Sequence, residues 1–330
     1  MTGQPGRQSV LYIGGCGRSG STLLDRMLGQ IPEFTSVGEL FLLWQRGLME
    51  NHPCGCGRPF RSCPFWERVG VEAFRGWHAV DAHELIALQR RVDRNRLIPL
   101  MARPNLVPGY RRDFDRYADY LVRLYRGVQR ASGAPVVVDS TKHPSTAFLL
   151  SRLGSIDLCV VHLVRDSHGV AFSWTKLVPK PEATAQVSYM SRYHPVVTGL
   201  RWTVYNAFFQ ALRQTEVPTF LLRYEDLVRQ PRESIHRIVA FAGGERDETS
   251  VGFIGKDYVD LDHGHSVTGN PMRLKRGRIP LQRDEDWRHQ MTRLDRAVVS
   301  ATTWPHLLRY GYWGPAPAKE LAEPATRETR

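Results

Sequence analysis

The chain has 330 residues, enough for one large α/β domain with a substantial core or for two small domains. Lysine and arginine number 45 against 33 for aspartate and glutamate, and the resulting net charge of +12 suits anionic ligands. The basic residues are scattered without a long basic run, so nucleic-acid binding is not favoured. Residues 1–9 are polar and predicted to be flexible, and the apolar run after them is too short for a signal sequence or a transmembrane segment, which predicts a soluble cytoplasmic protein.

The first predicted elements are a buried strand and a helix joined by a glycine-rich loop. Residues 10–13 form a short apolar run, and the apolar residues after the loop recur at helical spacing. Gly15 and Gly20 have the spacing of a nucleotide-binding P-loop, but Ser21 stands where that motif has lysine. Backbone N–H groups and the start of the helix favour an anion there, and Arg18 is the only cation of the loop. The missing lysine disfavours an ordinary ATP or GTP reaction.

Residues 32–80 are rich in glycine, proline, cysteine and aromatic residues and are predicted to form an irregular insertion over one end of the sheet. Potential ligands of a small structural zinc site lie in this insertion at His52, Cys54, Cys56 and Cys63. The cysteines could equally form a disulfide-stapled loop or stay reduced, because the Cys-x-Cys spacing is shorter than the usual two-residue gap. Cys16 and Cys159 are interpreted as ordinary buried thiols.

Strands and helices alternate through the rest of the chain. Helices are predicted over 82–100 and 114–131, and the aromatic stripe of the second is interpreted as core. The further predicted elements are strands at 135–138, 158–164 and 219–222 and helices at 145–153 and 233–242, the last ended by Gly243. This pattern predicts an α/β fold, with a P-loop-type, mostly parallel central sheet, helices on both faces and a single domain over 10–313. Residues 314–330 are predicted to be a disordered tail.

Four motifs follow one another along the chain. They are G-G-C-G-R-S-G-S-T-L-L at 14–24, V-H-L-V-R-D-S-H-G-V-A-F-S-W at 161–174, R-Y-E-D-L at 223–227 and G-N-P-M-R-L-K-R-G at 269–277. Together they resemble the sulfotransferases that use 3′-phosphoadenosine 5′-phosphosulfate, particularly the bacterial and Golgi-type branches with an R-S-G-[ST]-T loop. The resemblance covers most of the predicted domain and implies transfer of a sulfuryl group to an acceptor hydroxyl, with no metal required.

The resemblance also implies which residues bind the donor. The 5′-phosphosulfate would be surrounded by Arg18, Ser19, Gly20, Ser21 and Thr22. Arg165 at a strand end and Ser173 eight residues later would contact the 3′-phosphate. The C-terminal nucleotide loop would contribute Ser266, Asn270, Arg273 and Gly277, while the roles of Lys275, Arg276 and Arg278 stay open.

Candidate catalytic residues follow from the same resemblance. Glu39 matches the carboxylate that serves as the base in related enzymes, and Lys142 matches a position that stabilises the transferring group or the leaving phosphate. Arg18 is grouped with them as a cation close to the transferring group. His143 is the rival base, because imidazole titrates near neutrality, and Tyr224 of the Y-E-D-L motif is expected to be mainly structural.

The acceptor is predicted only as a class: a small molecule, a carbohydrate or a glycolipid with a free hydroxyl. Residues 40–115 and 176–200 are expected to shape its pocket. Aromatic side chains of these segments either line that pocket or belong to the core: Trp44, Phe65, Trp66, Tyr110, Tyr189 and Tyr193. The alternative hypotheses are a P-loop nucleotide or metabolite kinase and a non-catalytic polyanion-binding protein, and the sequence leaves the oligomeric state open.

Overall fold

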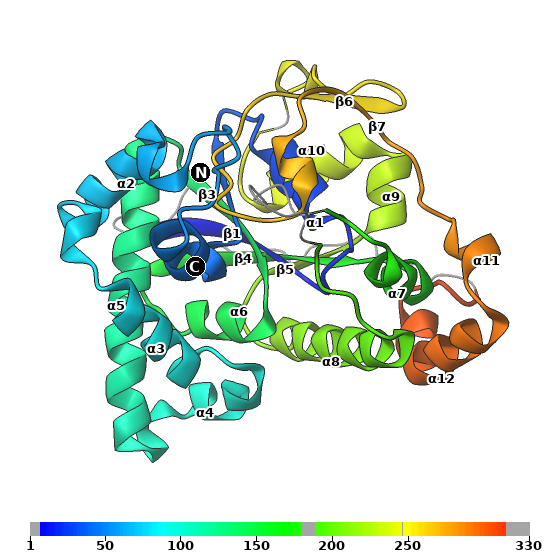
Figure 1. Cartoon of the computed structure of the whole chain (residues 1–330), viewed down its shortest axis with the longest axis horizontal. Coiled ribbons are helices and arrows are strands. Elements are labelled where there is room, and N and C mark those ends of the chain that lie inside the picture. The colour runs from blue at the N-terminus through cyan, green and yellow to red at the C-terminus, as the bar shows by residue number, and fades with distance from the viewer. Residues whose placement is uncertain (1–6, 180–188, 246, 315–330) are drawn as a thin grey trace.

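A five-stranded parallel sheet forms the centre of the computed structural model, which describes residues 7–179, 189–245 and 247–314 (Figure 1). Its strands lie in the order β2-β3-β1-β4-β5, and every neighbouring pair is parallel. They are β1 (Gln8–Gly14), β2 (Phe34–Gly38), β3 (Val136–Lys142), β4 (Ile156–Val164) and β5 (Thr219–Arg223). The predicted α/β class with a parallel central sheet is confirmed.

Helices cover both faces of the sheet, and the strands are apolar on both faces for that reason. In β1, Val10 and Tyr12 belong to the core on one face, whereas Leu11 and Ile13 belong to the core on the other. The first core is completed by α5 (Pro108–Ser132), α6 (Pro144–Leu150) and α8 (Pro195–Arg213). The second is completed by α1 (Ser21–Leu28), α9 (Tyr224–Arg229) and α10 (Pro231–Phe241).

The connections from β1 and β4 run to opposite edges of the sheet. After β1 the chain passes through α1 to β2, while after β4 it passes through α7 (Ser167–Thr175) and α8 to β5. Adjacent strands whose connections diverge leave a crevice at their carboxyl ends, where open α/β sheets bind ligands. The fold therefore predicts a binding site between the ends of β1 and β4.

The insertion between β2 and β3 lies on the left in Figure 1 and consists mainly of α2 (Pro64–Phe74), α3 (Ala82–Val92), α4 (Ile98–Ala102) and α5. The prediction of irregular structure from residue 32 onwards is wrong for β2, which forms the edge of the sheet. The prediction of a single helix over 82–100 is also wrong, because α3 ends at Val92 and α4 begins at Ile98. Between them, the buried carboxylate of Asp93 accepts a hydrogen bond from the Thr146 hydroxyl. The aromatic stripe of α5 is buried, as predicted.

After α10 the chain forms an antiparallel ribbon of β6 (Tyr258–Leu261) and β7 (Gly277–Pro280), then α11 (Trp287–Gln290) and α12 (Arg293–Arg309), which packs along α8. Gly243 has a φ of 82° just beyond α10, as its predicted helix-ending role requires. The predicted tail lies outside the described residues except for Gly314, as do residues 1–6 of the predicted flexible N-terminus. Among the described residues, no helix combines the length and apolarity needed to cross a membrane.

Candidate functional site

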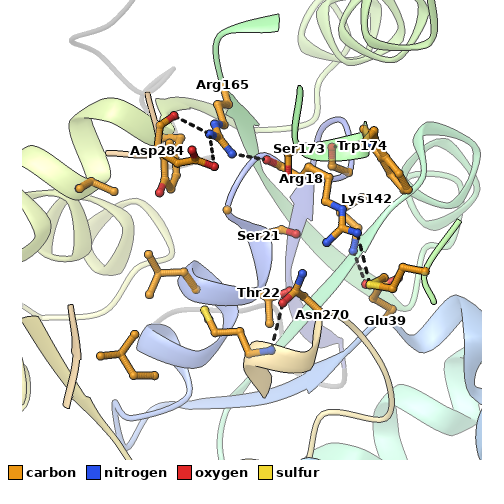
Figure 2. Close-up of a pocket in the computed structure, with 18 of the residues that line it drawn as sticks. Arg18, Ser21, Thr22, Glu39, Lys142, Arg165, Ser173, Trp174, Asn270 and Asp284 are labelled. Carbon is orange, nitrogen blue, oxygen red and sulfur yellow. Dashed lines mark hydrogen bonds and ion pairs between the residues drawn. The ribbon is translucent and has the colours of Figure 1, made fainter. Parts of the chain in front are cut away.

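A cavity of about 460 Å³ opens at the carboxyl ends of the strands, as the sheet topology requires. Figure 2 shows the side chains that converge on it from the loop after β1, the ends of β2, β3 and β4, and the segment after α10. Nine predicted site residues line the cavity: Arg18, Gly20, Ser21, Thr22, Glu39, Lys142, Arg165, Ser173 and Asn270. The local motifs thus converge in space although they span more than 250 residues of sequence.

The glycine-rich loop presents the start of α1 to the cavity. Gly20 precedes the helix with a φ of 90°, and a Cβ atom there would lie 2.4 Å from Cδ2 of Tyr224, so only glycine fits. Ser21 and Thr22, the first helical residues, line the cavity. Because the first N–H groups of a helix have no intrahelical acceptor, this end of α1 favours an anion.

Arg18 stands in the loop with a left-handed backbone, at a φ of 72°. Its guanidinium carbon lies 4.9 Å from the ring centroid of Trp174, and Nη2 lies 3.3 Å from Sδ of Met190. Trp174 in turn donates a hydrogen bond from Nε1 to the carbonyl oxygen of Gly17, at 3.3 Å. Burial lowers the pKa of Arg18, but an arginine stays charged at neutral pH, so the loop holds a fixed cation over the cavity.

Glu39 and Lys142 form an ion pair that lines the cavity on the same side as Arg18 (Figure 2). Glu39 follows β2 and Lys142 ends β3, so the two neighbouring parallel strands bring them together. Nζ of Lys142 lies 2.6 Å from Oε1 of Glu39 and also donates to the carbonyl oxygen of Ser140, at 2.8 Å. The side chains are only 14% and 18% exposed, so the pair is shielded from bulk water yet open to the cavity.

His143, the rival base, lies beside this pair. Its Nδ1 atom is 3.0 Å from the hydroxyl of Tyr205, and its ring packs against Phe41 at 4.4 Å between centroids. Burial lowers the pKa of His143 to about 3, with smaller contributions from Lys142 and Arg201. The imidazole is therefore neutral and weakly basic at neutral pH.

Arg165 leaves the end of β4 and closes the other side of the cavity. Its Nη1 atom donates to the carbonyl oxygen of Arg18 at 3.1 Å, and its guanidinium lies over the ring of Tyr224 at 4.9 Å. Nη2 donates to the carbonyl oxygen of Asp284 at 3.0 Å and lies 3.3 Å from its Oδ2 (Figure 2). Lys176 pairs with the same carboxylate at 3.2 Å. Although burial opposes it, the charges of Arg165 and Lys176 hold the pKa of Asp284 below its usual range.

Four predicted donor residues do not line the cavity: Ser19, Ser266, Arg273 and Gly277. Ser266 is buried behind it, with its hydroxyl 3.3 Å from Oδ2 of Asp25, and Gly277 begins the exposed ribbon strand β7. Arg273 is also buried, at 1% exposure. The loop that carries Ser266 and Arg273 is held in place by Arg26 of α1, which donates to the carbonyl oxygens of Asp262 and Met272, both at 2.9 Å.

The cavity is lined by several residues that sequence reasoning did not single out. Arg201 and Tyr205 come from α8, and Met190 comes from the segment before it. None of residues 40–115, all of which the structure describes, lines the cavity. Of the aromatic candidates for the acceptor pocket, Trp44, Trp66 and Tyr110 belong to the core.

The three clustered cysteines meet a different histidine from the predicted one. Cys54, Cys56 and Cys63 gather with His265, whereas Nε2 of His52 lies 3.0 Å from Oε2 of Glu50. The predicted ligand set is therefore wrong in one member, since a histidine more than 200 residues away gave no local signal. None of the five cysteines, all within the described residues, forms a disulfide bond, and Cys16 and Cys159 are buried thiols, as predicted.

A parallel sheet with a glycine-rich loop before its first helix, and with four cations around one cavity, is typical of a protein that binds an anionic ligand. The family model described as "Sulfotransferase family" matches residues 11–248. The chain belongs to the sulfotransferase family. A comparison with curated proteins returned no match.

The chain is also similar to solved structures of sulfotransferases. It is 22% identical to the sulfotransferase domain of the olefin synthase from Synechococcus PCC 7002, with a TM-score of 0.48 and coverage of 92% of this chain and 97% of that one. The sulfotransferase domain from the curacin biosynthetic pathway is 16% identical, with a TM-score of 0.47 and coverage of 89% and 97%. Sulfotransferase STF9 from Mycobacterium avium is 15% identical, with a TM-score of 0.41 and coverage of 75% and 67%.

Proposed function

We propose that the protein transfers the sulfuryl group of 3′-phosphoadenosine 5′-phosphosulfate to a hydroxyl of a small-molecule, carbohydrate or glycolipid acceptor. The observation that carries this proposal is the separation of cations within one cavity: Arg18 of the loop after β1 and Lys142 at the end of β3 lie at one side, and Arg165 lies at the other. A donor with a phosphosulfate at one end of its ribose and a phosphate on the ring needs two such anion sites.

The donor would lie across the switch point of the sheet. Its phosphosulfate would meet the start of α1, the hydroxyls of Ser21 and Thr22, and Arg18. Its 3′-phosphate would meet Arg165 and Ser173, the latter on the last turns of α7. Because Asp284 is ion-paired with Arg165, the 3′-phosphate must compete with that carboxylate for the guanidinium.

Glu39 is the proposed base. Its carboxylate would accept the proton of the acceptor hydroxyl while the acceptor oxygen forms a bond to sulfur and the bond from sulfur to the bridging phosphate oxygen breaks. Lys142, 2.6 Å away, would stabilise the charge that develops on that bridging oxygen, and adenosine 3′,5′-bisphosphate would leave. His143 is less suited to be the base, because its pKa of about 3 makes it weakly basic and Tyr205 contacts its Nδ1 atom.

Calorimetry with adenosine 3′,5′-bisphosphate, and with ADP and 5′-AMP for comparison, tests the donor site. Wild type is expected to prefer the bisphosphate, and Arg165→Ala is expected to lose that preference while retaining weak binding of ADP through the loop after β1. Arg288→Ala is a matched control, since this exposed arginine does not line the cavity. Equal affinity for ADP and the bisphosphate in the wild type would refute the proposed donor.

Two further assays distinguish the alternative functions. Magnesium-dependent ATP hydrolysis would favour a kinase. Binding of heparin with a steep salt dependence, together with no transfer of label from the sulfate donor to any hydroxyl acceptor, would favour a polyanion-binding protein.

A further inference from the structure

We propose that Cys54, Cys56, Cys63 and His265 bind one structural zinc ion that ties the insertion to the loop at the donor site. The three cysteines lie at the start of the insertion and the histidine lies between β6 and β7, so the ion would join segments about two hundred residues apart in sequence. Their four ligand atoms lie within 4.8 Å of one another.

Four of the six distances between these atoms match the edges of a zinc tetrahedron. With bonds of about 2.3 Å to sulfur and about 2.0 Å to nitrogen, tetrahedral geometry places two sulfurs about 3.8 Å apart and a sulfur and a nitrogen about 3.5 Å apart. Sγ of Cys63 lies 3.7 Å from Sγ of Cys54 and 3.7 Å from Sγ of Cys56. Nδ1 of His265 lies 3.4 Å from Sγ of Cys63 and 3.8 Å from Sγ of Cys54.

A disulfide does not account for this arrangement. A disulfide bond brings two sulfurs to about 2.05 Å and would leave the third cysteine and the histidine without a role. None of the three thiols forms a disulfide, and Sγ of Cys63 is equally far from the other two sulfurs, as expected when each donates to a common centre. Three sulfurs and one imidazole form a closed ligand set typical of structural zinc rather than of catalytic zinc, which keeps an open position.

The surroundings hold the ligands in place. The ring of Phe65 stacks on His265 at 4.6 Å with an interplanar angle of 13°, and Nε1 of Trp66 donates to the His265 carbonyl oxygen at 2.9 Å. The amide of Gly55 donates to the carbonyl oxygen of Ser266 at 2.9 Å, and a Cβ atom at Gly55 would lie 2.8 Å from the carbonyl oxygen of Gly264. The two segments therefore touch through backbone, which brings His265 close to the three cysteines.

One positive side chain faces the cluster from outside. Nη2 of Arg276 lies 3.4 Å from the carbonyl oxygen of Cys56. A zinc ion with three thiolates and one neutral imidazole carries a net charge of −1, and a nearby guanidinium offsets that charge. Arg276, whose contact with the nucleotide the sequence left open, thus contacts the cysteine segment and does not line the cavity.

The ion would keep the loop after β6 closed over the donor site. His265 precedes Ser266, which bonds to Asp25 of α1, and the loop then continues to Asn270 on the cavity wall. This consequence rests on the proposed function, whereas zinc binding itself does not. Loss of zinc is therefore expected to weaken binding of adenosine 3′,5′-bisphosphate severalfold by loosening Asn270, without removing Arg165 or Arg18.

The first test is the metal content of the full-length chain. After expression with zinc and removal of any metal-binding tag, plasma mass spectrometry is expected to find about one zinc per chain. Reconstitution with cobalt is expected to give the thiolate-to-cobalt charge-transfer band and the intense visible bands of a tetrahedral site. Wild type that stays free of zinc after reconstitution, or that yields a disulfide among these cysteines on peptide mapping, would overturn the proposal.

Variants then assign the ligands. His265→Ala and Cys63→Ser are expected to lose zinc, whereas His52→Ala and Cys159→Ser are matched controls that keep it. If Cys63→Ser fails to fold, the zinc content of wild type and of His52→Ala still shows whether the chain binds zinc without His52. Full zinc retention by His265→Ala would contradict the proposed ligand set. Because zinc content is independent of donor binding, failure of the proposed function and failure of the metal site give different results.

Discussion

Nζ of Lys142 lies 2.6 Å from Oε1 of Glu39, and the two residues stand at the ends of adjacent parallel strands. Each strand end is fixed by the sheet, so the pair is positioned by backbone hydrogen bonds rather than by a loop. A proton acceptor and a cation held this close can act on the two oxygens of an in-line transfer, one attacking and one leaving.

Glu39→Gln is expected to keep donor binding and to lower turnover by a factor of about 10² to 10⁴, the usual contribution of a general base. The amide keeps the size of the carboxylate but cannot accept the acceptor proton. Calorimetry with adenosine 3′,5′-bisphosphate and turnover with labelled donor measure the two effects separately. Glu50→Gln, at a carboxylate outside the cavity, is the control. Full activity in Glu39→Gln would show that another group is the base.

Asp284→Asn is expected to tighten binding of adenosine 3′,5′-bisphosphate about two- to fivefold, the range of a partly exposed ion pair. The Asp284 carboxylate lies 3.3 Å from Arg165, where it competes with the proposed 3′-phosphate. Binding of ADP should change less, because ADP has no 3′-phosphate. Asp286→Asn is the matched control, since Asp286 pairs with Lys176 but not with Arg165. Weaker binding of the bisphosphate to Asp284→Asn would argue that the carboxylate orients Arg165.

Trp174→Ala is expected to weaken binding of the bisphosphate and of ADP alike, by about two- to fivefold, because the indole ring holds the Arg18 guanidinium through a cation–π contact. Trp174→Phe keeps an aromatic face and should restore part of the affinity, although it loses the hydrogen bond to Gly17. The affinities come from the same calorimetric titrations. No change in Trp174→Ala would mean that Arg18 does not depend on the ring.

The buried Asp93 is expected to make the fold less stable as the pH rises. Burial, with a smaller contribution from Asp139, raises the pKa of Asp93 to about 6, above the value of about 3.9 in an unfolded chain. The native state therefore binds the proton more tightly, and the stability from this group is complete below about pH 4 and lost as the pH rises through 6. The loss approaches about 3 kcal/mol for a shift of two units.

Urea unfolding of wild type and Asp93→Asn between about pH 4 and pH 7 measures this effect, because asparagine does not titrate there. The free energy of unfolding of wild type should fall relative to that of the variant over this range. Comparing how the free energy of unfolding changes with pH in the two proteins removes any pH-independent effect of the substitution on stability. Parallel pH profiles would show that Asp93 titrates near its ordinary pKa in the folded chain.

The sequence predicted the parts of this molecule whose signal is local. The loop from Gly15 to Ser21 and the strand that ends before Arg165 can each be recognised from a few consecutive residues. Residues of this loop, and Arg165 after the strand, line the cavity. The edge strand β2 was missed, because five residues with few apolar side chains resemble a loop when their neighbour in the sheet is unknown. Its partner β3 lies about one hundred residues later.

The other contacts that the sequence did not predict join residues that only the fold brings together. Asp284 meets Arg165, and His265 meets Cys63, across 119 and 202 residues. Arg201 and Tyr205 reach the cavity from α8, a helix that was not predicted from the sequence. No spacing rule links such residues, so a sequence pattern can suggest a charged or metal-binding group without identifying its partner.

Arg18 and Lys142 both have a left-handed backbone with a φ of 72°, a conformation that glycine adopts without steric strain. The protein thus holds two of the four cations that line its cavity in a conformation that costs about 1 kcal/mol or more each. Selection of variants for thermal stability alone would therefore favour glycine at these positions, and the substitution would remove the two charged side chains. A thermostable variant of this enzyme should therefore keep Arg18 and Lys142 and be stabilised by substitutions at other positions.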